Sequence, residues 1–204
     1  MTKPRRTLRL SAALGAALSV LLLAGPARAG EPTLLLRATI KKVIEMLKDP
    51  SLKGADKKKE RRAKMRETIS ARFDFTEMAR RSLARHWRKR TPEERKEFTA
   101  LFSSLMERSY VSKMEAYTDE VIHYGKERVD EDFARVKTVI ITKKQQEIPI
   151  QYSLHKTGGE WKVYDVIIEG VSLIKTYRQQ FRAIIRKTSY GDLVKKLRAK
   201  QEEG

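Results

Sequence analysis

Hydrophobic and polar positions follow two different periods along the chain, and the change falls near Tyr117. From Glu31 to Tyr117 the apolar residues recur at helical spacing, and after it, as far as Ile168, they tend towards every second position. These are the periods of amphipathic helices and of half-buried strands. Helical spacing returns after Gly170. The pattern therefore predicts four or five helices, about four strands and two further helices, in that order.

Helix breakers and capping residues mark several of the predicted boundaries. A first apolar stripe ends at Asp49-Pro50, a charged helix follows over about 57–70, and a short helix over about 75–85. Thr91-Pro92 predicts the start of the next helix, with Thr91 as N-cap and Pro92 at the first helical position. The first stripe consists of Leu36, Ile40, Val43, Ile44 and Leu47.

The strand region shows one clear inner face. Ile148, Ile150, Tyr152 and Leu154 alternate with more polar residues, which is typical of a half-buried strand. Segments 133–142 and 161–168 are more continuously apolar, which predicts strands covered on both faces. The run 156–159 ends in two glycines and predicts a hairpin turn. We therefore expect an α+β fold in which N-terminal and C-terminal helices pack on one face of a curved four-stranded antiparallel sheet.

The first 29 residues have the pattern of a secretory signal. Four basic residues precede a run of 16 uncharged, mostly apolar residues, Leu10–Gly25, and the small residues Ala27 and Ala29 follow. The run is shorter than the roughly 20 residues of a membrane-spanning helix. We expect export with cleavage after Ala29, which leaves one domain over residues 30–204. That domain retains 40 Lys and Arg against 26 acids, a net charge of +14.

Composition and motifs offer little chemistry. The chain contains no cysteine, which excludes disulfides, thiolate nucleophiles and zinc–thiolate sites. It contains no phosphate-binding loop, no nucleophile elbow and no HExxH motif. The three histidines have no common metal-ligand spacing, and Asp165 and Glu169 lie too far apart on one predicted strand to share a proton. We expect no enzyme activity, no metal, no cofactor and no nucleic acid partner.

Three segments are strongly basic: 53–66, 80–90 and 186–200. Their cations are interleaved with other residues at helical spacing, as on an ordinary solvated helix face. In an exported protein the same cations could instead meet anionic lipid headgroups, where each Lys or Arg contributes about 1 kcal/mol. The sequence leaves both interpretations open.

Motifs spread over almost the whole exported chain resemble the MlaC (toluene-tolerance, Ttg2-type) family. The first group is Phe73-Asp74-Phe75, Met78-Ala79-Arg80, Trp87, Thr91-Pro92-Glu93, Phe98 and Phe102. The second group is Tyr110, Tyr117, Tyr152, Gly159, Trp161–Val166, Gly170-Val171-Ser172, Tyr177-Arg178 and Gln180-Phe181. Their order and spacing, over about Thr33 to Leu197, carry the resemblance. The basicity of 57–66 and 80–90 departs from the family pattern, as does Arg85, where a small residue is expected.

The resemblance implies a periplasmic phospholipid carrier. Such a carrier shuttles lipid between an outer-membrane lipoprotein–porin complex and an inner-membrane complex of an ABC transporter and an MCE-domain protein, and so maintains outer-membrane lipid asymmetry. It also implies a monomer with phospholipid as cargo, whose tails lie in a cavity between sheet and helices. A basic envelope adaptor without such a cavity remains the alternative, and a small pocket enzyme is a weaker third.

Apolar residues on the inner strand positions and on one helix face are the candidate cavity lining. They are Phe98, Phe102, Leu105, Ile140, Ile150, Tyr152, Val163, Val166 and Ile168. A plain core and a lipid cavity have the same composition, so either role fits each of these residues.

Overall fold

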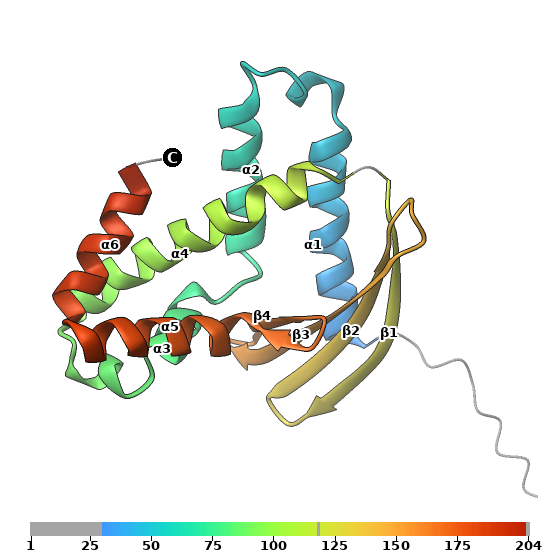
Figure 1. Cartoon of the computed structure of the whole chain (residues 1–204). Helices are drawn as coiled ribbons and strands as arrows, with labels where there is room; N and C mark the ends of the chain where they lie inside the picture. The colour runs from blue at the N-terminus through green and yellow to red at the C-terminus, as the bar shows by residue number, and fades with distance from the viewer. Residues whose placement is uncertain (1–29, 118, 203–204) are drawn as a thin grey trace, which may run out of the picture.

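A curved antiparallel sheet and a group of helices make up the protein, as a computed structural model shows (Figure 1). The structure describes residues 30–117 and 119–202, so the expected signal segment lies outside the described residues. The helices are α1 (Glu31–Lys48), η1 (Pro50–Leu52), α2 (Lys58–Ser70), α3 (Phe75–Leu83), η2 (Ala84–Lys89), α4 (Pro92–Glu115), α5 (Leu173–Lys187) and α6 (Tyr190–Glu202). The strands are β1 (Val121–Asp130), β2 (Phe133–Ile141), β3 (Glu147–Thr157), β4 (Glu160–Ile168) and β5 (Val171–Ser172).

The predicted helix boundaries are confirmed where breakers and caps marked them. α1 ends before Asp49, whose side chain then accepts a hydrogen bond from the Ser51 amide and caps η1. α4 begins with a capping box, in which the Glu94 amide donates to the Thr91 hydroxyl and the Thr91 amide donates to the Glu94 carboxylate. These contacts satisfy amides that have no partner within the first helical turn.

The strands follow one another in the order β1-β2-β3-β4-β5, each antiparallel to the next. The predicted hairpin is confirmed: Gly158 and Gly159 have φ of +57° and +81°, a region that glycine enters without steric cost. The sheet has a fifth strand that the sequence did not predict. β5 has only two residues, paired with Ile167 and Ile168 after a turn at Gly170, and two residues are too few to show a period.

The prediction that β2 is covered on both faces is wrong for its first half. Ala134, Val136 and Thr138 are buried on the inner face, but Arg135 and Lys137 on the outer face are exposed. Phe133, on the same outer face, is 50% exposed. The first half of β2 is therefore an ordinary half-buried strand, as the alternation of its charged positions, Arg135 and Lys137, with apolar ones indicates.

The helices form two groups, so the expectation that all of them pack on one sheet face needs correction. α1 contacts β1 and β2, near one edge of the sheet. α3 and α5 contact β4, near the opposite edge. α3, α4, α5 and α6 enclose a core of their own, centred on Phe98, Phe102 and Phe181. The Phe181 ring packs edge to face against Phe98 and Phe102, at 5.7 and 6.1 Å between centroids. The buried residues of this core all come from helices, and Tyr164 of β4 packs against it.

Ion pairs attach α2 to α4. Arg61 and Arg62 bind the two oxygens of Glu115 at 2.9 and 2.6 Å, and Arg66 binds Glu107 at 2.6 Å. The basic segment 53–66 is thus only partly a solvated face, because its arginines are the partners of acids on α4.

Candidate functional site

The inner face of the sheet is an apolar platform. In the strand register, Ile122 of β1 lies beside Ile140 of β2, which lies beside Ile148 of β3. The neighbouring row crosses four strands: Tyr124, Thr138, Ile150 and Ile168. The isoleucines of these rows are only half-buried. This face therefore has apolar area that the protein itself does not fully cover.

α1 lies over the platform and is held at its N-terminal end. The Thr33 amide donates to Glu127 of β1 at 2.8 Å, and the Trp161 indole donates to Glu31 at 3.1 Å. Leu36 packs between these contacts and the sheet and is 1% exposed. Further along α1, Ile40 and Ile44 are only half-buried. The helix is thus closed against the sheet at its start and open towards its end.

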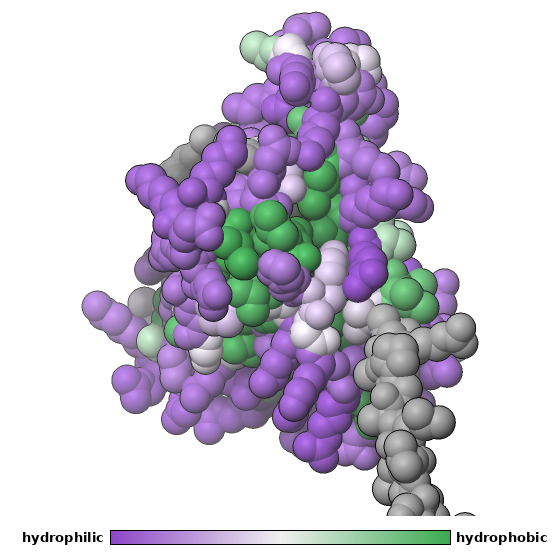
Figure 2. Space-filling model, turned by 90° about the vertical axis from the view of Figure 1, so that its right-hand side faces the viewer, coloured by the Kyte–Doolittle hydropathy of each residue, from purple (hydrophilic) through white to green (hydrophobic). Residues whose placement is uncertain are grey.

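A groove of about 370 Å³ lies between this open part of α1 and strand β1. Ile40, Ile44 and Ile122 line it together with the rings of Tyr117 and Tyr124, while charged side chains of α1 and Glu120 complete its lining. Figure 2, which views the side of the molecule that carries β1 and β2, shows hydrophobic side chains gathered in a patch framed by hydrophilic ones. The groove combines an apolar lining with a charged border, and its volume is within the range of small-molecule sites.

The polar atoms of this region favour neutral or amphipathic occupants. Burial raises the pKa of Tyr152 to about 12 and also raises that of Tyr124, so both phenols are uncharged at neutral pH. The Arg37 guanidinium lies 4.4 Å from the centre of the Tyr124 ring. At the far end of α1, Lys48 forms an exposed ion pair with Asp119 at 2.5 Å. Charge is therefore available at the border of the groove but not on the apolar platform.

The nine predicted lining residues fall in two places. Six lie on the inner face of the sheet: Ile140, Ile150, Tyr152, Val163, Val166 and Ile168. The other three, Phe98, Phe102 and Leu105, belong to the separate helical core, and the first two are 0% exposed. The structure therefore does not bring the helix residues of the prediction together with the sheet residues.

The sequence reasoning missed the contributions of α1 and β1. Ile40 and Ile44 belong to the apolar stripe that the sequence predicts, but nothing in one sequence shows that this stripe faces a groove. Strand β1 has an irregular register between Tyr124 and Glu127, which obscures its alternation. Tyr117, Ile122 and Tyr124 lie close together in the sequence, and this spacing is a weak indication that the segment lines an apolar site.

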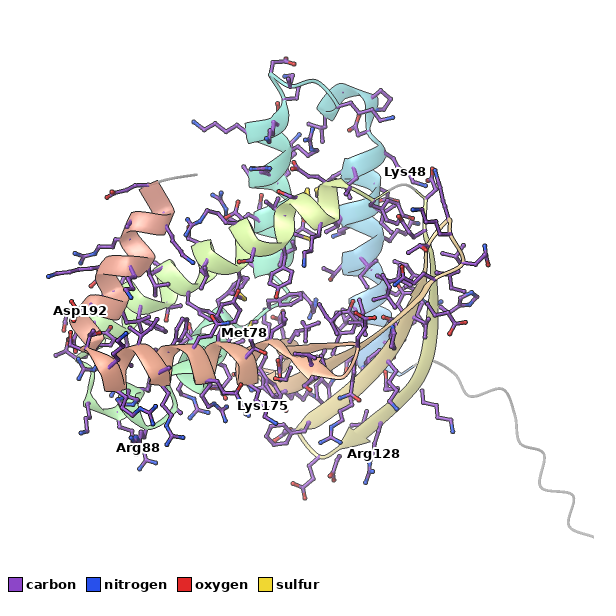
Figure 3. The ribbon with its side chains drawn as sticks, viewed as in Figure 1. Lys48, Met78, Arg88, Arg128, Lys175 and Asp192 are labelled. Carbon is purple, nitrogen blue, oxygen red and sulfur yellow. The ribbon has the colours of Figure 1, made fainter. Side chains whose placement is uncertain are left out.

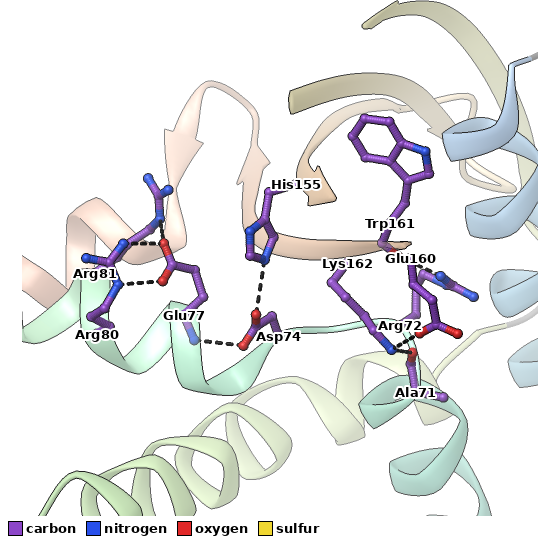
Figure 4. A network of polar contacts seen from close by, with 10 residues as sticks. All are labelled: Ala71, Arg72, Asp74, Glu77, Arg80, Arg81, His155, Glu160, Trp161 and Lys162. Carbon is purple, nitrogen blue, oxygen red and sulfur yellow. Dashed lines mark hydrogen bonds and ion pairs between the residues drawn. The ribbon is translucent and has the colours of Figure 1, made fainter. Parts of the chain in front are cut away.

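A second hollow, of about 300 Å³, adjoins a polar network between α3 and the sheet. Asp74 accepts from the Glu77 amide at 2.8 Å, which caps α3, and its other oxygen lies 3.0 Å from His155 Nε2 (Figure 4). Nearby, Arg72 donates to the Trp161 carbonyl and Lys162 to the Ala71 carbonyl. One oxygen of the Asp74 carboxylate thus caps α3, and the other joins the start of α3 to β3.

This network does not form a catalytic arrangement. Over the part of the chain that the structure describes, no serine or threonine hydroxyl hydrogen-bonds to His155. Asp165, the other carboxylate of interest, accepts from the Ser172 hydroxyl at 2.6 Å and the Ile174 amide at 3.1 Å, so it fixes the start of α5.

Among residues 30–117 and 119–202, no three acidic or histidine side chains group as a metal site would require. None of the helices described has the length and apolarity to cross a membrane.

Comparisons with known proteins identify relatives of this arrangement. The toluene tolerance protein Ttg2D of Pseudomonas putida is 30% identical over 95 residues, which is 46% of this chain and 44% of the relative. The intermembrane phospholipid transport system binding protein MlaC of Haemophilus influenzae is 26% identical over 120 residues, 56% of each chain. The chain thus spans about half the length of the curated relatives it matches.

A solved structure shares the fold. The phospholipid-binding protein from Ralstonia solanacearum, determined in complex with a phospholipid, superposes with a TM-score of 0.76 at 24% identity. The match covers 85% of this chain and 98% of that protein. The family model for the MlaC protein matches residues 37–199. Because that match takes in most of the chain, including the larger part of α1, the sheet and the helical core, the chain belongs to the MlaC family.

Proposed function

We propose that this protein binds a phospholipid and carries it between membranes, with the acyl tails on the apolar platform beneath α1. The observation that carries the proposal is the half-buried inner face of the sheet, which continues into the groove between α1 and β1. Membership of the MlaC family and the names of the two relatives support it. The Ralstonia structure supports it too, since a protein of the same fold holds a phospholipid.

The physics of lipid transfer explains why such a site is needed. Each buried CH₂ contributes about 0.8 kcal/mol, so exposing two chains of ~16 carbons to water costs on the order of 25 kcal/mol. A carrier offsets this cost by non-directional apolar contact, at about 25 cal/mol per Å². The headgroup needs only water and the charged border of the groove. Lipids that differ only in their headgroup should therefore bind alike.

The wider setting is part of the same proposal. The chain is exported after removal of residues 1–29, works in the periplasm as a monomer, and exchanges lipid with the two membrane complexes of an Mla-like ABC system. The outer-membrane partner is a lipoprotein–porin complex, and the inner-membrane partner contains the MCE-domain protein. Phospholipid is cargo, with no cofactor and no catalysis by this chain. Because the sequence has no phosphate-binding loop, the partner ATPase supplies the energy.

Of the six predicted lining residues on the sheet, the four half-buried ones are proposed to contact the tails, together with Ile40, Ile44 and Ile122: Ile140, Ile150, Tyr152 and Ile168. Val163 and Val166 are buried and are proposed to complete the wall of the site behind them. Ile150 offers the sharpest test, because it is half-buried in the middle of the platform and the next residue, Gln151, is on the opposite face of the same strand. Ile150→Asp places an unpaired carboxylate against the tails, which is strongly unfavourable. Gln151→Asp adds the same charge on the outer face, beside Lys137.

The experiment is organic extraction and mass spectrometry of protein purified from the envelope of producing cells. We expect near-stoichiometric phospholipid with the unchanged chain and with Gln151→Asp, and at least about a tenfold loss with Ile150→Asp. Circular dichroism of both variants checks that the fold is retained. If folded Ile150→Asp kept its phospholipid, or if the unchanged chain carried none, the proposal would be wrong.

A further inference from the structure

α5 carries an uninterrupted row of cations on its outer side. Lys175, Arg178, Arg182 and Arg186 are all exposed, and they follow one another at intervals of three and four residues. Such positions lie on one side of a helix, and with a rise of 1.5 Å per residue the row is about 16 Å long. The opposite side of α5 packs into the helical core. The whole helix contains no acidic residue.

The short helix η2 extends this row. Arg85, Arg88 and Lys89 are exposed, and η2 directly follows α3, against which α5 packs. Arg178 of α5 donates a hydrogen bond to the Arg81 carbonyl near the end of α3, at 2.9 Å. In Figure 3, Arg88 and Lys175 both project from the lower side of the molecule. The four cations of the α5 row and the three cations of η2 together form the basic face.

Cations of η2 and of α5 both lie near His86. Burial lowers the pKa of this imidazole first, and nearby positive charges lower it further. Those charges belong to Arg85 and Lys89 of η2, to Arg90, and to Arg182 of α5. Cations from both elements therefore lie close enough to repel a proton on one side chain.

Cations of the basic face have no acidic partner among the described residues, unlike the arginines of α2 and α3 that follow. On α2, Arg61, Arg62 and Arg66 are paired with Glu115 and Glu107. On α3, Arg80 and Arg81 share Glu77. Within the described residues, no ion pair involves any cation of the basic face. Its charge is thus available to a partner outside the chain.

We propose that the basic face docks the protein on the anionic headgroups of a membrane surface. A protein partner would need apolar anchors at the centre of its interface. The exposed large hydrophobic residues of the described chain all belong to other elements: Leu34, Val121, Val129, Phe133 and Val171. A face that offers long, flexible cations without such anchors suits a surface of many negative charges, where attraction does not depend on matched shapes. This inference concerns the membrane surface and not the cargo, so it can fail while lipid carriage holds.

The test measures sedimentation with vesicles of phosphatidylcholine alone or in equal parts with phosphatidylglycerol, using protein purified from the envelope of producing cells. Arg182→Gln with Arg186→Gln removes two charges from the basic face. Lys58→Gln with Lys59→Gln is the matched control, because both lysines are exposed on α2 and have no ion pair among the described residues. Both double variants lower the net charge equally and should keep their cargo phospholipid.

We expect binding to the anionic vesicles that weakens as salt rises, and no binding to phosphatidylcholine alone. The Arg182/Arg186 double variant should bind roughly 30-fold more weakly, and the Lys58/Lys59 variant should bind almost as the unchanged chain does. Equal losses in both variants would overturn the proposal, since total charge and not this face would then decide. Absence of binding to the anionic vesicles at low salt would overturn it as well. If the protein bound immobilised polyglutamate but not these vesicles, an acidic protein partner would be favoured instead.

Discussion

Glu115, near the end of α4, is the acid on which two arginines of α2 converge. The hydrogen bond from Arg62 lowers the pKa of Glu115 most, and burial opposes it with the next largest effect. The hydrogen bond from Arg61 and the charges of both guanidinium groups lower the pKa further, to about 2. The Glu115 side chain is 15% exposed, so solvent screens this pair only in part. A segment that the sequence showed merely as basic thus contains a specific attachment between two helices.

The attachment should be visible as pH-dependent stability. Because the folded pKa of Glu115 lies below its ordinary value of 4.5, its contribution is present above about pH 5 and is lost as the pH falls towards 2. We expect Glu115→Gln to lower the free energy of unfolding by about 2 kcal/mol at pH 7 and by much less near pH 2. Urea unfolding at several pH values measures the difference.

Glu67→Gln is the control for this change. Glu67 is exposed on α2 and, among the described residues, has no ion pair, so its replacement should have little effect at either pH. A loss with Glu115→Gln that did not change with pH would show that the carboxylate charge is not what stabilises the contact.

At the scale of elements, α4 shows how one helix face can suggest two roles. Phe98, Phe102 and Leu105 were predicted to line a lipid cavity, but the structure surrounds them with α5 and α6. The Phe102 ring packs edge to face against Tyr177 and Phe181, at 5.8 and 6.1 Å between centroids. Periodicity located the face correctly, and only the position of α5 shows what covers it.

Phe102→Leu separates the two roles. It shortens a fully buried side chain and removes its ring contacts with Phe98, Tyr177 and Phe181, so we expect a loss of about 1 to 2 kcal/mol in the free energy of unfolding. If the helical core is separate from the tails, the phospholipid content per folded chain should not change. Chemical unfolding and lipid mass spectrometry on the same preparation measure both quantities. A large loss of lipid at unchanged stability would return Phe102 to the cavity lining.

At the scale of the whole molecule, the two hydrophobic clusters differ in how completely the protein covers them. The helical core is closed by its own aromatic residues, whereas the sheet cluster leaves half-buried isoleucines beneath α1. α1 is fastened mainly at its start, through Glu31 and Thr33. A bound lipid should therefore stabilise the α1 side of the molecule more than the helical core.

Hydrogen exchange before and after extraction of the lipid tests this division. We expect amides of α1 and β1 to exchange faster in the extracted protein, because Ile40, Ile44 and Ile122 lose contacts that the tails provided. Amides in the middle of α4 serve as the control within the same molecule and should be unchanged. Equal acceleration in α4, or none in α1, would contradict a site beneath α1.

The sequence by itself determined what depends on local chemistry. Asp49-Pro50 ends α1, Thr91-Pro92 starts α4, and the paired glycines at 158–159 turn the chain between β3 and β4. The alternation of Ile148, Ile150 and Tyr152 identified the inner face of β3. Each of these follows from the conformational preferences of a few adjacent residues, which is why one sequence suffices.

Only the tertiary structure decided which apolar faces meet and which cations find an acid. Phe102 and Ile150 both belong to apolar faces that periodicity identifies, yet the first is fully buried against α5 and the second stays half-buried in the cluster beneath α1. Arg62 and Arg182 are both arginines on basic helices, yet the first reaches Glu115, 53 residues away, and the second reaches no acid among the described residues. Burial and ion pairing depend on contacts between distant segments, and periodicity describes only the segment in which a residue lies.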